Sequence, residues 1–177
     1  MNLLLLPANV PFKETITKTA SIEHRYKQQT GGHGHYAHVF LRLEPLPRGG
    51  GVEFAEEVVG GRVPREFFPY VEKGVRRAAA EGVLAGYPLV DVRVVLYDGS
   101  YHVVDSAGID FDTAGYWGLK KGVQQAAPVI LEPVMRLEVV APEAYTGDII
   151  GDLNGRRGRI LGMTPQGDGT ALIEALA

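Results

Sequence analysis

Cysteine is missing from the 177-residue chain, and so is any long apolar segment. Without cysteine there can be no disulfide bond and no thiolate metal site, which fits a reducing cytoplasm. The apolar run MNLLLL is short, lacks a basic region before it and is soon followed by Pro7 and Pro11, unlike a signal peptide. No stretch approaches the roughly 18 to 20 apolar residues that cross a bilayer. The sequence therefore predicts a soluble, cytoplasmic protein that does not contact a membrane.

A strong positive charge is also missing. The net charge of −3 argues against a protein that binds nucleic acid through charge alone. The charges are unevenly distributed, because the first fifty residues hold six Lys or Arg against three Glu. Four of the five histidines lie in the same part, at His24, His33, His35 and His38. We expect positive potential there, although a solvated strand face would carry similar residues.

The third absence is a nucleotide motif. No GxxxxGK[ST] occurs in the chain, so no site that binds and hydrolyses a nucleotide is expected. The segment TGGHGHY, residues 30–36, has the glycines and histidines for a metal, phosphate or RNA site. A phosphate loop should open a helix, but a strand pattern follows here. A zinc site built from the four histidines would make this a small metal protein. That site is disfavoured, because no cysteine and no nearby acidic ligand accompanies the histidines.

A serine hydrolase is a further alternative, because Asp98, Ser100 and His102 lie within five residues of one another. Known triads are assembled from distant segments of the chain. This arrangement is therefore disfavoured, and no catalytic residue is predicted.

Alternating and helical patterns predict two α+β parts. Strands are expected over 14–29 and 36–46, forming a hairpin with residues 30–36 at its tip. A third strand over 52–59, a helix over 65–82, a fourth strand ending in a tight turn at Asp98-Gly99, and a helix over 109–127 follow. Residues 128–133 are bounded by proline and are predicted to be a linker.

The remainder, residues 135–177, is predicted to form a strand, a helix over 143–158 and two more strands. This β-α-β-β order is part of a split βαβ, or ferredoxin-like, arrangement. So few residues rarely sustain a core alone. The part is therefore expected either to pack on the larger domain, or to be a fragment that associates with another chain through its open sheet edge.

Both predicted tips combine glycine with tyrosine and histidine. Aromatic rings stack on unpaired bases, and imidazoles donate to phosphate or 2′-hydroxyl groups. The candidate RNA-contacting residues are Gly31, Gly32, His33, Gly34, His35, Tyr36, Asp98, Gly99, Ser100, Tyr101 and His102.

Long segments identify a family. They are QTGGHGHYAHV, VGGRVPREFFPYVEKGV, GYPLVDVRVVLYDGSYHVVDSA and PVILEPVMRLEVVAPEAYTGDIIGDLNGRRGRILGM. In this order and spacing the chain resembles, from about Lys13, the C-terminal part of bacterial elongation factor G. The resemblance implies that residues 1–12 are an extension, that 13–134 are domain IV, and that 135–177 are the first half of domain V. Domain IV resembles domain 2 of ribosomal protein S5, with a left-handed β-α-β crossover.

The resemblance also implies a role on the ribosome. In the family, the tip of domain IV enters the decoding centre of the small subunit and contacts tRNA, mRNA and ribosomal RNA during translocation. Arg156, Arg157 and Arg159 would face ribosomal RNA of the large subunit. GTP and Mg²⁺ belong to a domain that this chain does not include, so the chain is expected to be no enzyme although its parent would be a GTPase. His33 stands where many members of the family carry arginine. The alternative that the parent is a ribosomal-protection paralogue of the same family therefore stays open.

Overall fold

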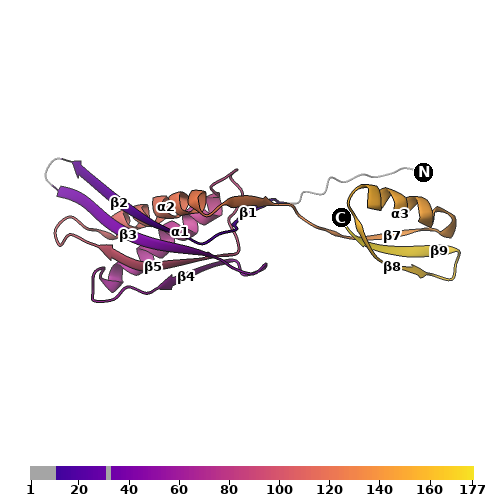
Figure 1. Cartoon of the computed structure of the whole chain (residues 1–177), viewed down its shortest axis with the longest axis horizontal. Coiled ribbons are helices and arrows are strands. Elements are labelled where there is room, and N and C mark those ends of the chain that lie inside the picture. Colours follow the sequence, from indigo (N-terminus) through magenta and orange to yellow (C-terminus); the bar gives the residue numbers. More distant parts are fainter. Residues whose placement is uncertain (1–10, 31–32) are drawn as a thin grey trace. The chain divides into compact units, whose positions relative to one another are not determined.

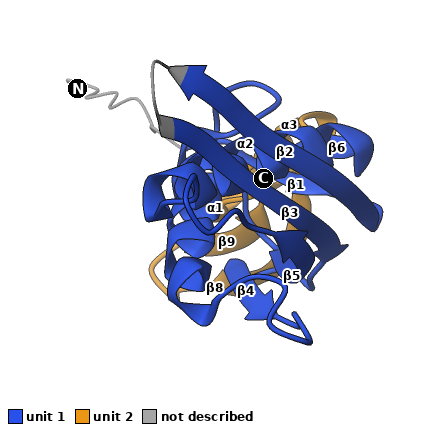
Figure 2. Cartoon of the chain, turned by 90° about the vertical axis from the view of Figure 1, so that its left-hand side faces the viewer, with its two compact units in different colours: residues 1–132 blue, residues 133–177 orange. Residues whose placement is uncertain are grey.

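The chain folds into two compact units, residues 1–132 and 133–177 (Figure 2). The computed structural model describes residues 11–30 and 33–177. Both units combine helices with antiparallel strands, which confirms the predicted α+β class. Within these described residues, no helix is both long enough and apolar enough to span a bilayer.

The larger unit is built on a four-stranded sheet (Figure 1). Its strands lie in the order β2 (Ala20–Thr30), β3 (His33–Pro45), β5 (Val92–Ser100) and β4 (Val52–Glu56). β2 and β3 form the predicted antiparallel hairpin, whereas β4 and β5 are parallel and are joined through a helix. The unit therefore contains both a long hairpin and a β-α-β connection.

Two helices cover one face of this sheet. A 3₁₀ turn, η1 (Arg65–Phe67), leads into α1 (Phe68–Glu81), and α2 (Gly108–Gln125) packs against α1 and against β2 and β3. The apolar face of these helices is buried, at Phe68, Val71, Val75, Ala78, Ala79, Phe111, Ala114, Gly118 and Val123, with Ala126 buried just after α2. Phe67 of η1 is half-buried beside it. The alternating residues Val39, Leu41 and Leu43 of β3 complete this core. Helical and strand periodicity thus meet in one apolar layer.

The first four residues of the predicted linker, 128–131, form a strand, and only residues 132 and 133 lie at the boundary of the two units. β6 (Pro128–Leu131) pairs antiparallel with β1 (Lys13–Ile16), and the two make a separate two-stranded sheet. The prediction was wrong because the pairing partner lies more than a hundred residues away, and a four-residue segment between prolines has no alternation to reveal it.

Glu14 of β1 holds this small sheet to the loop that follows α1. Its carboxylate is fully buried and accepts hydrogen bonds from the backbone N–H groups of Val83, Leu84, Ala85 and Tyr87, at 2.7, 2.8, 2.6 and 3.1 Å. Burial by itself raises the pKa of Glu14, but the four donors outweigh it and lower the pKa below its ordinary value. A buried charge is thus satisfied by the main chain.

The smaller unit has one helix on a three-stranded antiparallel sheet. The chain runs through β7 (Arg136–Pro142), η2 (Glu143–Tyr145), α3 (Thr146–Gly155), β8 (Arg159–Pro165) and β9 (Thr170–Leu176). The spatial order is β7-β9-β8. Leu153 of α3 packs with Ile173 and Ala175 of β9, with Ile149 and Ile150 beside them. The predicted order of strand, helix, strand and strand is confirmed.

Candidate nucleic-acid interface

The hairpin β2–β3 ends at the side of the larger unit that is farthest from β1 (Figure 1). Thr30 and His33 are the last paired residues of the two strands, and the predicted contacts Gly31 and Gly32 lie outside the described residues. His33, Gly34, His35 and Tyr36 belong to β3. Of the segment 30–36 that was predicted as the tip of the hairpin, Thr30 and residues 33–36 are therefore strand.

The loop predicted for the second tip segment lies at later residues than expected. Asp98, Gly99 and Ser100 are not a tight turn, because they continue β5 and pair with Phe40, Val39 and His38. Glycine is required at position 99 by close packing, since a Cβ there would lie 2.4 Å from the carbonyl oxygen of His38. The connecting loop lies farther along, over residues 101–107, and includes the predicted contacts Tyr101 and His102.

Asp105 and Ser106 fasten this loop to the start of β3. The Asp105 carboxylate accepts a hydrogen bond from the backbone N–H of Gly34 at 3.0 Å. The backbone carbonyl of Asp105 accepts from the N–H of Tyr36 at 2.8 Å. The Ser106 hydroxyl donates to the carbonyl of Tyr36 at 2.6 Å and accepts from the N–H of His102 at 2.8 Å. Residues 33–36 and 101–107 thus form one structure, which we call the tip.

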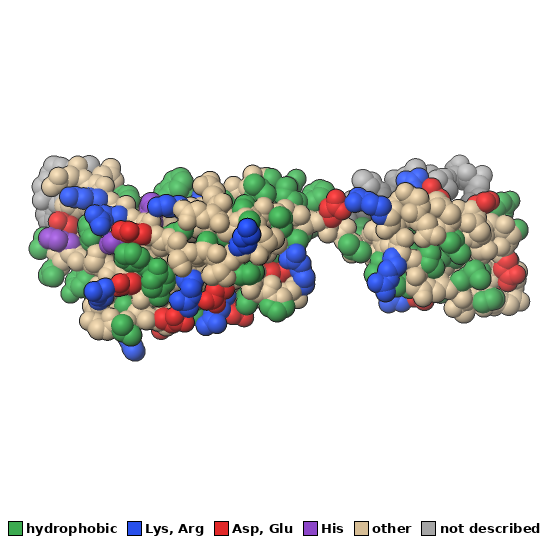
Figure 3. Space-filling view, viewed as in Figure 1, with side chains coloured by type: hydrophobic (Ala, Val, Ile, Leu, Met, Phe, Trp, Pro, Cys, Tyr) green, Lys and Arg blue, Asp and Glu red, His purple; other side chains and the backbone are tan. Residues whose placement is uncertain are grey.

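Each of the tip histidines His35 and His102 lies beside a carboxylate. His102 Nδ1 is 3.3 Å from Asp105 Oδ2, and His35 Nδ1 is 2.8 Å from Oδ1 of the buried Asp110. Asp110 also accepts from the N–H of Ala107 at 2.9 Å, at the start of α2. Figure 3 shows histidine side chains gathered at this end of the unit, next to acidic ones. These pairs orient the imidazoles, because each Nδ1 donates to its carboxylate. Each Nε2 then serves as an acceptor, or as a donor when the imidazole is protonated.

The sequence reasoning missed Asp105, Ser106 and Asp110. Acidic and hydroxyl residues before a helix are a recognisable N-terminal signal, but their contacts with residues 34–36 span about seventy positions and leave no local trace. It also missed two apolar side chains in the same loop, Val103 and Val104, which are 84% and 71% exposed.

The disfavoured hydrolase arrangement does not form. Ser100 lies on the sheet face opposite the helices, where its hydroxyl is 2.9 Å from the Tyr36 hydroxyl and 3.1 Å from His38 Nδ1. His38 Nε2 is in turn 2.8 Å from Oε1 of Glu23. Asp98 pairs with Arg62 at 2.6 Å and not with His102. Every one of these polar groups has a protein partner, as in a structural network.

The three predicted arginines lie at the end of α3. Arg156 caps the helix and donates from Nε to Asp152 at 2.9 Å, while Arg157 has a left-handed backbone with φ of 65°. Arg159 begins β8 and is exposed. Their position after the helix also suits the negative end of its dipole, so a structural role and an RNA contact are compatible.

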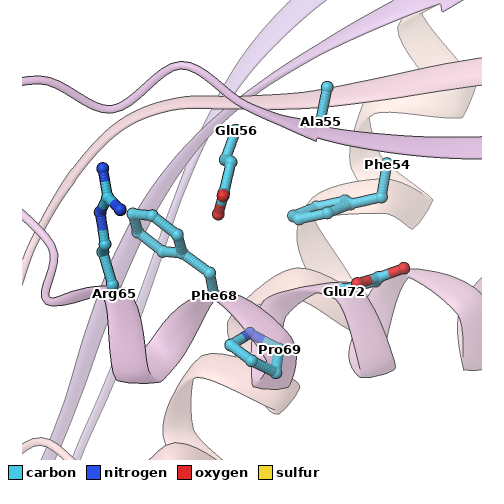
Figure 4. A pocket seen from close by; sticks show the side chains of 7 residues that line it. All are labelled: Phe54, Ala55, Glu56, Arg65, Phe68, Pro69 and Glu72. Atoms are coloured by element: carbon cyan, nitrogen blue, oxygen red, sulfur yellow. The ribbon is translucent and has the colours of Figure 1, made fainter.

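A depression of about 370 Å³ lies between β4 and α1. Figure 4 shows Phe54 and Phe68 on its walls, with Arg65 and Glu72 at opposite ends and Glu56 between them. These charged side chains do not converge on a common point, as a reactive site would require. Among the described residues, no three His, Asp or Glu side chains come together as ligands for a metal ion.

Comparisons with known proteins match nearly the whole chain. Residues 8–127 match the family model described as elongation factor G, domain IV, and residues 129–177 match the model described as elongation factor G C-terminus. These two matches leave no stretch of the chain for a GTP-hydrolysing domain.

Individual relatives agree with the family models. The chain is 55% identical to an elongation factor G-like protein of Thermotoga maritima over 166 residues, which cover 94% of this chain and 24% of that protein. It is 54% identical to elongation factor G of Aquifex pyrophilus over 163 residues, covering 92% of this chain and 23% of that protein.

A crystal structure of a Thermus thermophilus protein is similar with a TM-score of 0.86 and 43% identity, over 96% of this chain and 25% of that one. The chain therefore spans about a quarter of the length of these proteins.

Proposed function

The chain belongs to the elongation factor G family, and we propose that it is the part of a cytoplasmic translation factor that enters the ribosome during translocation. The tip would reach the decoding centre of the small subunit, where it would contact tRNA, mRNA and ribosomal RNA. GTP and Mg²⁺ would be held by a domain outside this chain. Arg156, Arg157 and Arg159 of the smaller unit would contact ribosomal RNA of the large subunit.

The fastening of loop 101–107 to β3 is the observation that supports this proposal. A probe that advances beside moving RNA needs a tip that keeps its shape, because ordering it upon contact would cost conformational entropy. Asp105 and Ser106 supply that order before any RNA is bound. No enzymatic step is required of these residues.

The exposed side chains of the tip match the chemistry of RNA. The side chain of His102 is 60% exposed while its Nδ1 faces Asp105. Nε2 is therefore available to accept from a 2′-hydroxyl or, when the imidazole is protonated, to donate to a phosphate. Tyr101 is 40% exposed and presents a ring on which an unpaired base can stack.

The proposal is tested by His102→Ala in the full-length parent protein. We expect translocation, followed as tRNA movement in a single-turnover assay, to slow by about tenfold, or about 1.4 kcal/mol in activation free energy. GTP turnover should be unchanged. The stability of the unit should change by less than about 0.5 kcal/mol, because the side chain is on a surface loop.

Lys18→Ala is the matched control, because Lys18 is also exposed in a loop but lies between β1 and β2, away from the tip. It should translocate at the wild-type rate. Equal rates for His102→Ala and wild type, or equal slowing by both variants, would contradict a role for the tip.

A further inference from the structure

The outer surface of α2 carries the only tryptophan of the chain, Trp117. Its side chain is 51% exposed although tryptophan is usually largely buried. Trp117 lies nine residues after Gly108, about 13 Å along the helix from its start. The indole therefore belongs to a surface separate from the tip, and neither the core nor the tip explains its exposure.

Neighbouring side chains hold this indole in place. The rings of Trp117 and Tyr116 meet edge to face, with centroids 5.1 Å apart. Tyr116 is itself contacted by two cations, because Arg77 Cζ and Lys120 Nζ lie 4.4 and 4.5 Å from its ring centroid. Such cation–π contacts stabilise the aromatic side chain they touch. Trp117 and Tyr116 are thus held in place before any ligand binds.

A groove of about 250 Å³ runs beside the indole. Its lining contains two lysines and a histidine but no carboxylate, and consists of His24, Val83, Trp117, Lys120, Lys121 and Gln124. Lys120 is paired with Glu81 at 3.2 Å. Lys121 donates to the backbone carbonyl of Glu23 at 2.9 Å, and no carboxylate lies within ion-pair distance of it in the described part of the chain. The groove is therefore positively charged.

This charge distinguishes the α2 groove from the open face of the main sheet. On that face the arginines Arg42 and Arg62 already have acidic partners, since Arg42 pairs with Glu44 and Arg62 pairs with Asp98. Burial, together with the nearby Lys121 and His38, lowers the pKa of His24, so its imidazole is neutral and can either donate or accept. Of these two surfaces, the α2 groove is the one that offers a phosphate the unpaired charge of Lys121.

We propose that this groove binds single-stranded RNA, with one base stacked on Trp117 and the adjacent phosphates held by Lys120 and Lys121. An aromatic face next to cations is the arrangement by which proteins bind unpaired nucleotides. The site is a second RNA contact, distinct from the tip, and it does not depend on the translocation role. An acidic peptide could satisfy the lysines but would leave the indole without a stacking partner.

Because Trp117 is the sole tryptophan, the intrinsic fluorescence of the intact chain reports directly on this site. The chain is titrated with an oligouridylate of about ten nucleotides, a length that a small domain can cover. We expect saturable quenching by the RNA and none by oligoglutamate of equal charge. No quenching, or equal quenching by the two polyanions, would overturn the proposal.

Variants assign the binding to the named residues. Trp117→Ala should weaken binding of labelled RNA roughly 5- to 100-fold, as measured by fluorescence anisotropy, whereas Trp117→Phe retains a ring and should weaken it less. Two phosphate contacts predict a slope of about −1.4 for the logarithm of affinity against that of salt, which Lys121→Gln should reduce to about −0.7.

Lys13→Gln removes an exposed lysine of β1 that does not line the groove, and it is the matched control with an unchanged slope. Equal slopes for Lys121→Gln and Lys13→Gln would show that the lysines of the groove do not hold the phosphates. These measurements need no ribosome, so their failure would leave the tip proposal intact, and failure of the His102→Ala test would leave this site intact.

Discussion

The two units share one design, helices on a single face of a sheet, but they differ in how completely the helices cover it. Among the described residues of the larger unit, one cluster of twenty-one buried apolar side chains lies between the two helices and the sheets. In the smaller unit only Leu153, Ile173 and Ala175 are buried in the cluster beneath α3. A groove of about 550 Å³ lies open between α3 and β7, beside Val139 and Ile149. Similar architecture thus supports very different amounts of hydrophobic stabilisation.

The helical glycines differ between the units in the same way. In the larger unit α1 and α2 approach so closely that a Cβ on Gly74 would lie 2.0 Å from the carbonyl oxygen of Asp112, and one on Gly115 would lie 2.5 Å from that of Val71. In the smaller unit a Cβ on Gly147 or Gly151 of α3 would meet nothing within 4 Å. Glycine is therefore a packing requirement in one unit and a loss of helix propensity in the other.

The largest expected changes in the free energy of unfolding come from the same leucine-to-alanine substitution made in each of the two cores. Leu119→Ala, at a position with no exposure, should lower the free energy of unfolding of the larger unit by about 3–5 kcal/mol. Leu153→Ala, at the border of the open groove, should cost about 2–3 kcal/mol, because water and neighbours can fill the space. Hydrogen exchange read separately for each unit measures both. Equal losses in the two units would contradict the difference in core enclosure.

A matched pair of glycine substitutions should change stability in opposite directions. Gly74→Ala should destabilise the larger unit by about 3 kcal/mol, because the helices must move apart. Gly151→Ala should stabilise the smaller unit by about 0.5–1 kcal/mol, since alanine favours the helix and meets no neighbour. Denaturant unfolding followed by exchange mass spectrometry distinguishes the units. Stabilisation by Gly74→Ala would show that the crossing is looser than these distances require.

Glu14→Gln should destabilise the larger unit by about 2 kcal/mol at neutral pH, because an amide offers one acceptor to four backbone donors. The folded pKa of Glu14 is below its ordinary value of 4.5. Its carboxylate therefore stabilises the fold above about pH 4.5, and this contribution is lost as the pH falls through the folded pKa.

The difference between wild type and Glu14→Gln should accordingly shrink as the pH falls below about 4.5, as measured by urea unfolding. In the smaller unit, hydrogen bonds from Thr170 lower the pKa of Asp168. That carboxylate is exposed, so Asp168→Asn should produce the smallest effect. A difference for Glu14→Gln that stays constant across this pH range would show that its charge is not what the backbone donors require.

Local periodicity was sufficient to predict most elements of both units. The 3.6-residue spacing of Val71, Val75 and Ala78 determined which face of α1 is buried, and alternation did the same for Val39, Leu41 and Leu43. These patterns are readable because neighbours along a helix or strand share one environment. The composition of the two tip segments also indicated an exposed end, although not which of their residues form it.

Contacts between distant segments were decided only by the tertiary structure. Residues 128–131 are a strand because β1 offers a partner, and Asp98-Gly99 continues β5 because β3 runs alongside it. The partners of Glu14 and Asp105 lie about seventy positions away along the chain. In a sequence, a glycine predicts a turn, but its lack of a side chain permits either a bend or a close approach of two backbones. Whether a glycine forms a bend or a close contact depends on the strand or helix that packs beside it, and the tertiary fold brings that element there.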